Sequence, residues 1–337
     1  MSYASQMKGK WGLFTHFIDL VVNNPEKANS LGIRTSWEEC VDGVDVDRLA
    51  AEIASTGASW FGLTMHQQTA CICAPNEAFE RLTGIPRGEA TTHRDLPMEL
   101  GFALRKYGVD LMLYHTAEGP VLDQKAGDAL GGIEKNKPLN ETYFRNWLEV
   151  LREDARRYAS LVKYWWIDGC YPHLGYTPDR LQTVSDVFHS ENPDYAVALN
   201  YYGCARKFYE PYPDGVYRAD WFLDPAYAVV GEDYAAGETN VLAGLPDHWS
   251  NPGTGSHVLP QNRDAQWHLL AFLGKPSNPR AVYDGWGSPG LKYNAGWLAC
   301  YRREVMNRGG ALTFDCCVRR GGSIDPDQLA MLRSIAE

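Results

Sequence analysis

Short apolar runs alternate with amphipathic stretches along most of the chain. The run WGLFTHFI at 11–18 predicts a strand, and the stretch 44–57, with apolar residues at helical spacing, predicts a helix. A second pair follows, with a strand at 58–66 and a helix at 94–108. The further predicted strands lie at 109–115, 161–168 and 194–202, within 228–238, within 241–286 and at 310–317, and the further predicted helices lie at 141–160, 177–192, 290–309 and 325–337.

This alternation predicts an α/β fold in which crossover helices join parallel strands. Roughly eight strand–helix units in a chain of 337 residues fit a closed (β/α)8 barrel of the TIM type. We therefore expect residues 1–337 to form a single catalytic barrel domain. An open, doubly wound sheet is the alternative, but no GxGxxG motif follows the first predicted strand.

The bulk composition narrows the classes of partner. The formal net charge of −10 disfavours nucleic acid and anionic membranes. No apolar run reaches the roughly 18 residues that a membrane-spanning helix needs. Aromatic residues supply 12% of the chain, which is consistent both with a carbohydrate partner that stacks on their rings and with a core that is simply rich in aromatics.

The cysteines and the N-terminus bear on the compartment. None of the eight cysteines has the spacing of a zinc ribbon or of a disulfide framework. The first ten residues, MSYASQMKGK, lack the apolar core of a signal peptide. We expect a cytoplasmic protein with reduced thiols, with secretion as the alternative if a signal peptide was removed. Association into a homo-oligomer is left open.

Polar and aromatic residues gather at the ends of the predicted strands. In a (β/α)8 barrel the carboxyl ends of all strands meet at one rim, where catalytic and binding residues lie. A sugar needs many hydrogen-bonding partners and stacking faces, so this rim is predicted to bind carbohydrate. The candidate binding residues are His16, His66, Gln67, Tyr114, His115, Trp166, Asn200, Tyr202, Asp233 and Asp315.

The stretch YWWIDGCY at 164–171 places one carboxylate, Asp168, at the end of an apolar strand. A carboxylate in such surroundings is either ion-paired or present for its chemistry. Because strand residues alternate between faces, Val162, Tyr164 and Trp166 are expected to share one side with it. This pattern predicts that Asp168 points into the mouth of the barrel. An ion pair with a barrel Arg or Lys is the alternative.

Four stretches of the sequence carry motifs of a known family. They are KGKWGLFTHF, FGLTMHQQTACICAPN, YWWIDGCY and EVMNRGGALTFDCCVRRGGSIDPDQLAMLRSIAE. The first three resemble, in that order, the first, second and fourth strands of the α-L-fucosidase-like glycoside hydrolases, family 29. The fourth resembles the closing strand, Gly-rich loop and helix of the same family. The resemblance covers the catalytic barrel alone. It implies a (β/α)8 glycosidase that acts on an α-L-fucoside or a related glycoside, without a metal or cofactor.

The resemblance also implies a retaining mechanism in which Asp168 is the nucleophile. The acid/base of this family lies in variable loops, and Glu238 is the leading candidate here. Asp233 and Glu232 are the alternates. A retaining pair of carboxyl groups would lie roughly 5 Å apart, and an inverting pair ~6.5–9.5 Å apart.

The chain departs from the family at two places. Gln67 and Gln68 stand where the family has two adjacent histidines that bind the sugar. The first-strand motif reads His16-Phe17-Ile18 instead of His-Trp-Gly. The catalytic barrel is therefore better supported than a preference for fucose.

Two other functional classes remain open at this level. A carbohydrate-binding barrel without activity would have the same aromatic rim but no second carboxylate facing Asp168. A metal-dependent hydrolase on the same fold would use histidines and a carboxylate as ligands, although the HxH signature at the end of the first strand is missing. Its candidate ligands are His16, His66, His115 and Asp315.

Overall fold

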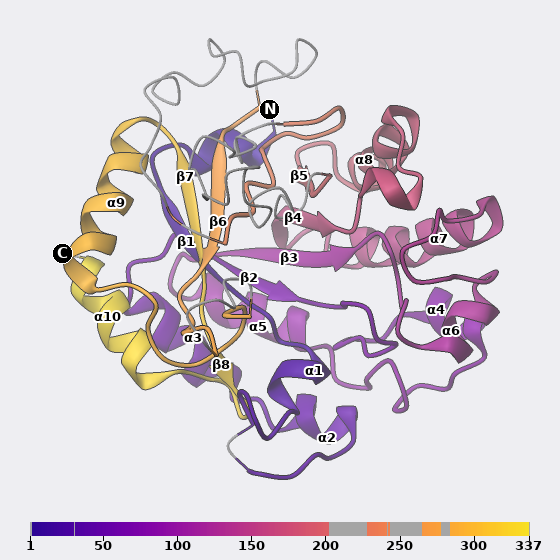
Figure 1. The fold of residues 1–337 in the computed structure, drawn as a ribbon, viewed down its shortest axis with the longest axis horizontal. Helices are drawn as coiled ribbons and strands as arrows, with labels where there is room; N and C mark the ends of the chain where they lie inside the picture. The colour runs from indigo at the N-terminus through magenta and orange to yellow at the C-terminus, as the bar shows by residue number, and fades with distance from the viewer. Residues whose placement is uncertain are drawn as a thin grey trace, which may run out of the picture.

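The fold is seen in a computed structural model, which describes residues 2–29, 31–201, 228–240, 242, 265–277 and 284–336. Its centre is a curled sheet of seven parallel strands in the order β5-β4-β3-β2-β1-β7-β6 (Figure 1). The strands are β1 (Trp11–Thr15), β2 (Trp60–Thr64), β3 (Asp110–Thr116), β4 (Val162–Asp168), β5 (Ala196–Leu199), β6 (His268–Phe272) and β7 (Ala311–Asp315). The predicted α/β class and parallel sheet are thus confirmed.

The strand order bears on the two predicted topologies. From β1 to β5 each strand pairs with the next one along the chain, always on the same side of the sheet. On the other side of β1 lie β7 and then β6. In a doubly wound sheet the chain returns to the middle and adds its next strand beside the first, whereas here the strand beside β1 is β7, the last of the seven. The observed order is the one that curls a sheet toward a barrel.

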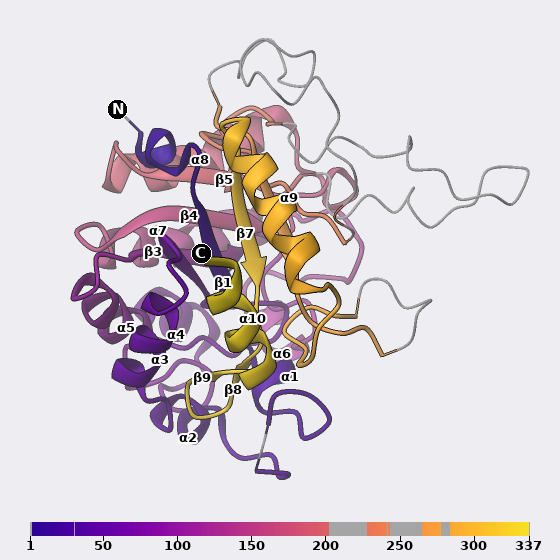
Figure 2. The same cartoon turned by 90° about the vertical axis from the view of Figure 1, so that its left-hand side faces the viewer.

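Helices cover the outer face of the curled sheet (Figures 1 and 2). Helix α5 packs on β3, α8 on β5 and α9 on β7. The helices are α1 (Asp19–Val22), α2 (Trp37–Asp42), α3 (Val46–Ala54), α4 (Glu77–Thr83), α5 (Leu96–Arg105), α6 (Gln124–Ala129), α7 (Glu141–Arg157), α8 (Pro178–Glu191), α9 (Ala295–Asn307) and α10 (Pro326–Ala336), with short 3-10 helices at Tyr3–Met7 and Pro172–Leu174. None of the helices in the described ranges is long and apolar enough to cross a membrane.

Side-chain caps fix where several helices begin. Asp95 accepts a hydrogen bond from the Met98 amide at the start of α5, and Asn140 does so from the Tyr143 amide at the start of α7. Asn294 caps α9 in the same way, so the helix predicted at 290–309 begins only at Ala295. A short hairpin, β8 (Val318–Arg319) with β9 (Ser323–Ile324), follows β7 and was not predicted from the sequence.

The sixth and seventh predicted strands were the least regular in the sequence. Strand β6 lies within the range 241–286, as predicted. The segment 228–238 forms no continuous strand, but it makes two parallel bridges beside β6, Tyr234 with Gln266 and Glu238 with Leu270. On its other side the Asp233 amide donates to the Val197 carbonyl of β5 at 2.8 Å. This segment therefore lies between β5 and β6.

Large aromatic side chains fill the interior of the curled sheet. Trp60, Tyr164 and Trp166 belong to one buried cluster there, and a Cβ on Gly12 would lie 2.2 Å from the Trp60 indole. Val162 belongs instead to the outer core between sheet and helices. The prediction that it shares a face with Trp166 is wrong, because a register shift between β3 and β4 follows Val162 and reverses the alternation.

Candidate active site

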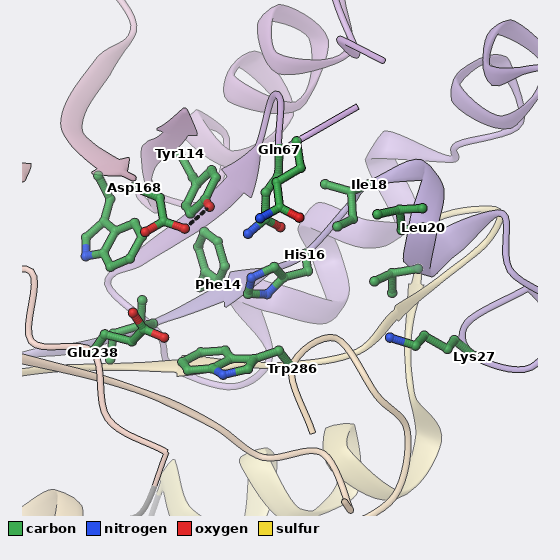
Figure 3. Close-up of a pocket in the computed structure, with 14 residues that line it drawn as sticks. Phe14, His16, Ile18, Leu20, Lys27, Gln67, Tyr114, Asp168, Glu238 and Trp286 are labelled. Atoms are coloured by element: carbon green, nitrogen blue, oxygen red, sulfur yellow. Dashed lines mark hydrogen bonds between the residues drawn. The ribbon is translucent and has the colours of Figure 1, made fainter. Parts of the chain in front are cut away.

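A cavity of about 490 Å³ opens at the carboxyl ends of the strands (Figure 3). Asp168 and Glu238 lie at one end of it and Lys27 at the other, with His16 and Trp286 between them. The cavity is lined by Phe14, His16, Ile18, Leu20, Val21, Lys27, Gln67, Gln68, Tyr114, Trp166, Asp168, Glu238, Leu270 and Trp286. Of the predicted binding residues, His16, Gln67, Tyr114 and Trp166 are thus brought together on one cavity with Asp168.

Asp168 is the last residue of β4, and its side chain is held by three donors. The Tyr114 hydroxyl donates to Oδ2 at 2.6 Å, and the Tyr171 hydroxyl donates to Oδ1 at 2.8 Å. Asn200 Nδ2 also donates to Oδ1 at 2.8 Å. Burial and the charge of Asp168 raise the pKa of both tyrosines well above its usual value, so both phenols remain donors. Only 9% of Asp168 is exposed, and its partners are these neutral donors rather than an Arg or Lys.

The glycine after Asp168 is required by the geometry of the turn. Gly169 has a φ of 73°, in the left-handed region, and a Cβ added to it would lie 3.0 Å from the backbone and side chain of Glu118. This sharp turn brings Tyr171 back toward Asp168. The sequence D-G-x-Y therefore supplies both the carboxylate and one of its donors.

Glu238 lies within about 5 Å of Asp168. Asn200 Nδ2 donates to Glu238 Oε2 at 2.6 Å as well as to Asp168 Oδ1 at 2.8 Å. The two protons of one amide group diverge by ~120°, so the two accepting oxygens lie about 5 Å apart. Asn200 itself is 3% exposed and does not line the cavity, so it spaces the two carboxyl groups rather than facing a ligand.

His16 forms one wall of the cavity and is fixed by Asp315. His16 Nδ1 lies 3.0 Å from Asp315 Oδ1, and Asp315 Oδ2 accepts from the Gly287 amide at 2.6 Å. Because the carboxylate can only accept, Nδ1 carries the proton and Nε2 is free to face the cavity. Asp315 is fully buried behind His16, so the prediction that it lines the binding site is wrong.

Aromatic rings form the floor and one side of the cavity. Tyr114 and Trp166 are stacked, with ring centroids 5.2 Å apart, and the Trp166 indole donates to the Ala236 carbonyl at 2.9 Å. Trp286 faces His16 with ring centroids 5.4 Å apart. Its indole donates to Asn240 Oδ1 at 3.0 Å, which fixes the ring at the rim. These faces are suited to the apolar side of a sugar ring.

His66 and His115 do not lie on this cavity. Both rings pack against Trp147 of helix α7, on the outer face of the sheet. His115 Nε2 lies 3.2 Å from buried Asp154, and burial keeps the pKa of His66 well below its usual value. The prediction that His115 joins Tyr114 on one cavity is wrong because adjacent residues of a strand point to opposite faces.

Asp233 and Glu232, the alternate acid/base residues, also lie off the cavity. Asp233 Oδ2 is 3.0 Å from His189 Nε2 and accepts from the Val197 amide at 2.9 Å. Glu232 is buried and accepts from the backbone amides of Leu199, Val229 and Ala236 at 2.7, 2.6 and 3.1 Å. Both carboxylates join the segment before Glu238 to β5 and are structural.

We expect Glu232→Ala to lower the free energy of unfolding by about 3 kcal/mol or more, because three buried amides lose their acceptor. Urea denaturation followed by circular dichroism would measure this loss. Glu304→Ala, which removes an exposed carboxylate paired with Arg308 on α9, is the control and should change stability by less than about 0.5 kcal/mol. Wild-type stability of the Glu232 variant would contradict the structural role.

Several residues of the site were not predicted from the sequence. Trp286 was missed because the strand before it could not be placed. Gln68, next to the predicted Gln67, lines the cavity, and Glu118 lies just behind it. Tyr171 stood within the motif YWWIDGCY, where its distance of three residues from Asp168 was the available signal. Tyr202, a predicted binding residue, lies outside the described residues.

The four candidate ligands of the metal hypothesis are not brought together. His16 and Asp315 lie on the inner side of the sheet, whereas His66 and His115 lie on the outer side. Within the ranges that the structure describes, no group of three or more His, Cys, Asp or Glu side chains is arranged to hold a metal ion. The seven described cysteines are unpaired, and Cys204 lies outside the described residues.

Comparison with known proteins gives likeness in structure only. No protein-family model and no curated protein matches the sequence. The endo-fucoidan hydrolase P5AFcnA, from glycoside hydrolase family 107, is similar with a TM-score of 0.64 and 17% identity, over 99% of this chain and 92% of that one. Two α-L-fucosidases are also similar in fold over 99% of this chain.

One of them is a family 29 enzyme from Bacteroides thetaiotaomicron, solved as a trapped covalent intermediate. It has a TM-score of 0.60 and 14% identity, with 73% of its chain covered. The other is AlfC, in complex with Fucα(1,6)GlcNAc, with a TM-score of 0.58 and 13% identity, and 96% of its chain covered. At these identities the likeness shows the fold.

Proposed function

We propose that the protein is a glycosidase that removes a terminal sugar by a retaining double displacement. The observation that carries this proposal is the pair Asp168 and Glu238. One oxygen of each accepts a hydrogen bond from Asn200 Nδ2, and the directions of the two N–H bonds set these oxygens about 5 Å apart. Retaining glycosidases have carboxyl groups roughly 5 Å apart, whereas inverting enzymes need ~6.5–9.5 Å to admit a water. A cavity walled by aromatic rings and polar groups surrounds the pair.

In the first step, an Asp168 oxygen forms a bond to the anomeric carbon as the bond to the leaving oxygen breaks. The three donors around Asp168 hold its carboxylate in place for the attack. The leaving oxygen takes a proton from Glu238. The products of this step are the free alcohol and a sugar esterified to Asp168.

In the second step, Glu238, now ionised, removes a proton from a water molecule. The water oxygen bonds to the anomeric carbon and Asp168 leaves as a carboxylate, which restores both groups. The position of Glu238 at the cavity, half-buried beside Trp166 and Trp286, suits a group that must exchange protons with both substrate and water. Glu232 and Asp233 are occupied by backbone contacts and cannot reach the same position.

The substrate we propose is an α-L-fucoside or a related glycoside. The similar folds include two α-L-fucosidases and an endo-fucoidan hydrolase, and a trapped covalent intermediate of one fucosidase supports a retaining mechanism on this fold. Gln67 and Gln68 replace the histidines of the family motif, so the hydroxyl pattern that this cavity selects differs from that of fucosidases with the two histidines.

We further infer that the segment 234–238 acts as the eighth member of a (β/α)8 barrel. Its bridges to Gln266 and Leu270 and the bond from Asp233 to Val197 support this role. In that position Glu238 stands at the carboxyl end of a barrel strand, like Asp168, where the catalytic groups of such barrels lie.

The test is a screen of nitrophenyl glycosides, including α-L-fucose, α- and β-galactose and L-arabinose, followed by trapping with a 2-fluoro glycosyl fluoride of the sugar that is cleaved. We expect release of nitrophenol from one sugar and a glycosyl adduct on the peptide that carries Asp168, detected by mass spectrometry. Binding of sugar without turnover of any glycoside would favour the carbohydrate-binding barrel. Inverted product or an adduct elsewhere would contradict the retaining assignment.

A further inference from the structure

A third carboxyl group, that of Glu118, lies beside the nucleophile and has no part in the reaction proposed above. Only 8% of Glu118 is exposed, and its side chain packs within 3.0 Å of where a Cβ on Gly169 would stand. The Ala117 amide, next to it, donates to the Asp168 carbonyl at 2.6 Å. Burial, and then the charge of Asp168, raise the pKa of Glu118 to about 7. A buried carboxyl group beside Asp168 therefore needs a structural or functional explanation.

Gln68 connects Glu118 to the cavity. Gln68 Nε2 donates to Glu118 Oε1 at 2.9 Å, and Gln68 is one of the residues that line the cavity. The backbone of Gln68 has a φ of 59°, a left-handed conformation that is uncommon for a residue other than glycine. The backbone carbonyl of Gln68 accepts a hydrogen bond from the Leu122 amide at 2.8 Å. Strained backbone that is fixed in this way is characteristic of functional sites.

The chemistry of the pair determines which end of the Gln68 amide faces the cavity. An ionised carboxylate only accepts hydrogen bonds, so it selects the NH2 end of the amide. The carbonyl end of Gln68 is then left for the cavity. Because Glu118 lies beside Asp168, this carbonyl is close to the anomeric carbon of a bound sugar. The polar neighbours of that carbon are the ring oxygen and the 2-hydroxyl, and only the hydroxyl can donate to a carbonyl.

We propose that Glu118 is a positioning residue: it orients the Gln68 amide so that the Gln68 carbonyl accepts a hydrogen bond from the sugar 2-hydroxyl. This inference rests on the proposed function, because it takes Asp168 to lie under the anomeric carbon. It adds a specificity pair that acts on the hydroxyl next to the reacting centre. Hydrogen bonds to the 2-hydroxyl strengthen in the transition state of glycoside hydrolysis, so the pair contributes to rate as well as to binding.

The groups that face Glu118 set how this pair responds to pH. Asp168 on β4 disfavours the ionised form of Glu118, whereas Lys135, after α6, favours it. The Tyr143 hydroxyl of α7 donates to the Glu118 carbonyl at 2.9 Å. The tyrosines whose own pKa is raised in part by Glu118 are Tyr114, Tyr143, Tyr171 and Tyr176, and all remain neutral donors near neutral pH. The charge that changes near pH 7 in this group is therefore that of Glu118.

The protonation state of Glu118 predicts the direction in which KM changes with pH. Above a pH of about 7 Glu118 is ionised and selects the productive orientation of Gln68. Below it, protonated Glu118 can donate to the Gln68 carbonyl instead, which turns the NH2 group toward the cavity. We expect KM to fall as the pH rises through about 7. We expect kcat to fall at higher pH, because the first step needs a proton on Glu238.

The kinetic experiment compares 4-nitrophenyl α-L-fucopyranoside with its 2-deoxy analogue in wild type, Glu118→Gln and Gln68→Ala. In wild type, removal of the 2-hydroxyl should lower kcat/KM about 10-fold to 100-fold, the range of a hydrogen bond in a closed site. In both variants this penalty should shrink to less than about 3-fold, and KM of Glu118→Gln should no longer depend on pH near 7. Gln67→Ala is the matched control, because it removes a neighbouring glutamine of the same cavity and should keep the wild-type pH dependence of KM.

A second readout needs neither substrate nor turnover. In wild-type protein labelled with 15N, the side-chain NH2 signals of Gln68, identified by their absence in Gln68→Ala, should shift with a midpoint near pH 7. The same signals should not shift in Glu118→Gln. This measurement tests the pairing even if a Glu118 variant folds poorly, since the wild-type titration alone can reveal it.

The outcomes separate this inference from the proposed function. An unchanged 2-deoxy penalty in Gln68→Ala, or Gln68 signals that do not shift near pH 7, would overturn the positioning role. A wild-type protein that cleaves no glycoside, while Gln68 titrates with Glu118 as described, would count against the glycosidase and support the pairing. Turnover by wild type with a pH-independent KM would support the glycosidase and overturn the pairing.

Discussion

Replacement of Asp168 by Asn is expected to lower turnover by about four orders of magnitude or more, because a neutral amide cannot form the ester to the anomeric carbon. Affinity for the free sugar should change by less than about 10-fold, since the cavity walls stay in place. Stopped assays with the nitrophenyl glycoside and calorimetric titration with the sugar would measure the two effects separately.

The structure also explains why this variant should fold. In Asp168→Asn, the new amide nitrogen can take the place of Oδ2 and donate to the Tyr114 hydroxyl, which turns to accept. The amide carbonyl then keeps the bonds from Tyr171 and Asn200. Asp47→Asn is the matched control, since it neutralises an exposed carboxylate of α3 that pairs with Lys106 and does not line the cavity, and it should retain turnover within about 3-fold. Wild-type turnover by the Asp168 variant would sink the nucleophile assignment.

Replacement of Glu238 by Ala is expected to have an effect that depends on the leaving group. Turnover of a glycoside with a poor leaving group, such as a methyl glycoside, should fall by about 10³-fold or more, because its oxygen must be protonated as it departs. The leaving group of a dinitrophenyl glycoside needs little protonation, so the rate of its first step should fall far less. A plot of log kcat/KM against leaving-group pKa would therefore be steeper for the variant than for wild type.

Azide provides the complementary test of Glu238. Without the residue as base, water attacks the glycosyl ester slowly, and a small anion that needs no deprotonation can replace it. We expect azide to accelerate turnover of the dinitrophenyl glycoside and to give a glycosyl azide of retained configuration. Glu238→Gln, which keeps the bond from Asn200, should show the same pattern with better packing. An equal loss on all substrates without rescue by azide would contradict the acid/base role.

The regular part of the fold and the place of Asp168 at the cavity could be predicted from the sequence because both follow from strong local patterns. Strands β1 to β5 are short apolar runs between amphipathic helices, and parallel strands in such a rhythm have few alternatives. Asp168 stood out because an ionisable side chain at the end of a buried strand must have a function or a partner. His16, Tyr114 and Trp166 followed from the same rule for strand ends.

The rest of the site depends on contacts that local patterns do not contain. Whether Tyr114 or His115 faces inward is decided by the register of one strand against its neighbours, and a shift of one residue exchanges them. Likewise, Glu238 is the leading acid/base candidate in the sequence and Glu232 an alternate, and no local pattern shows which of them reaches the cavity. They differ only because backbone amides of β5 and of their own segment occupy Glu232, while Asn200 turns Glu238 toward Asp168. Trp286 reaches the cavity from a segment without periodicity.

The two carboxyl groups stand on opposite ends of the seven-stranded sheet. Asp168 belongs to the side that ends at β5, and Glu238 is attached to β6 at the other end. The bonds that join these ends include those of Asn200, Glu232 and Asp233, together with the Trp166 indole on Ala236. The distance between the two proposed catalytic groups therefore depends on the stability of this junction and not on that of the sheet as a whole. Local opening of the junction would abolish the proposed activity, reversibly, while most of the molecule stayed folded.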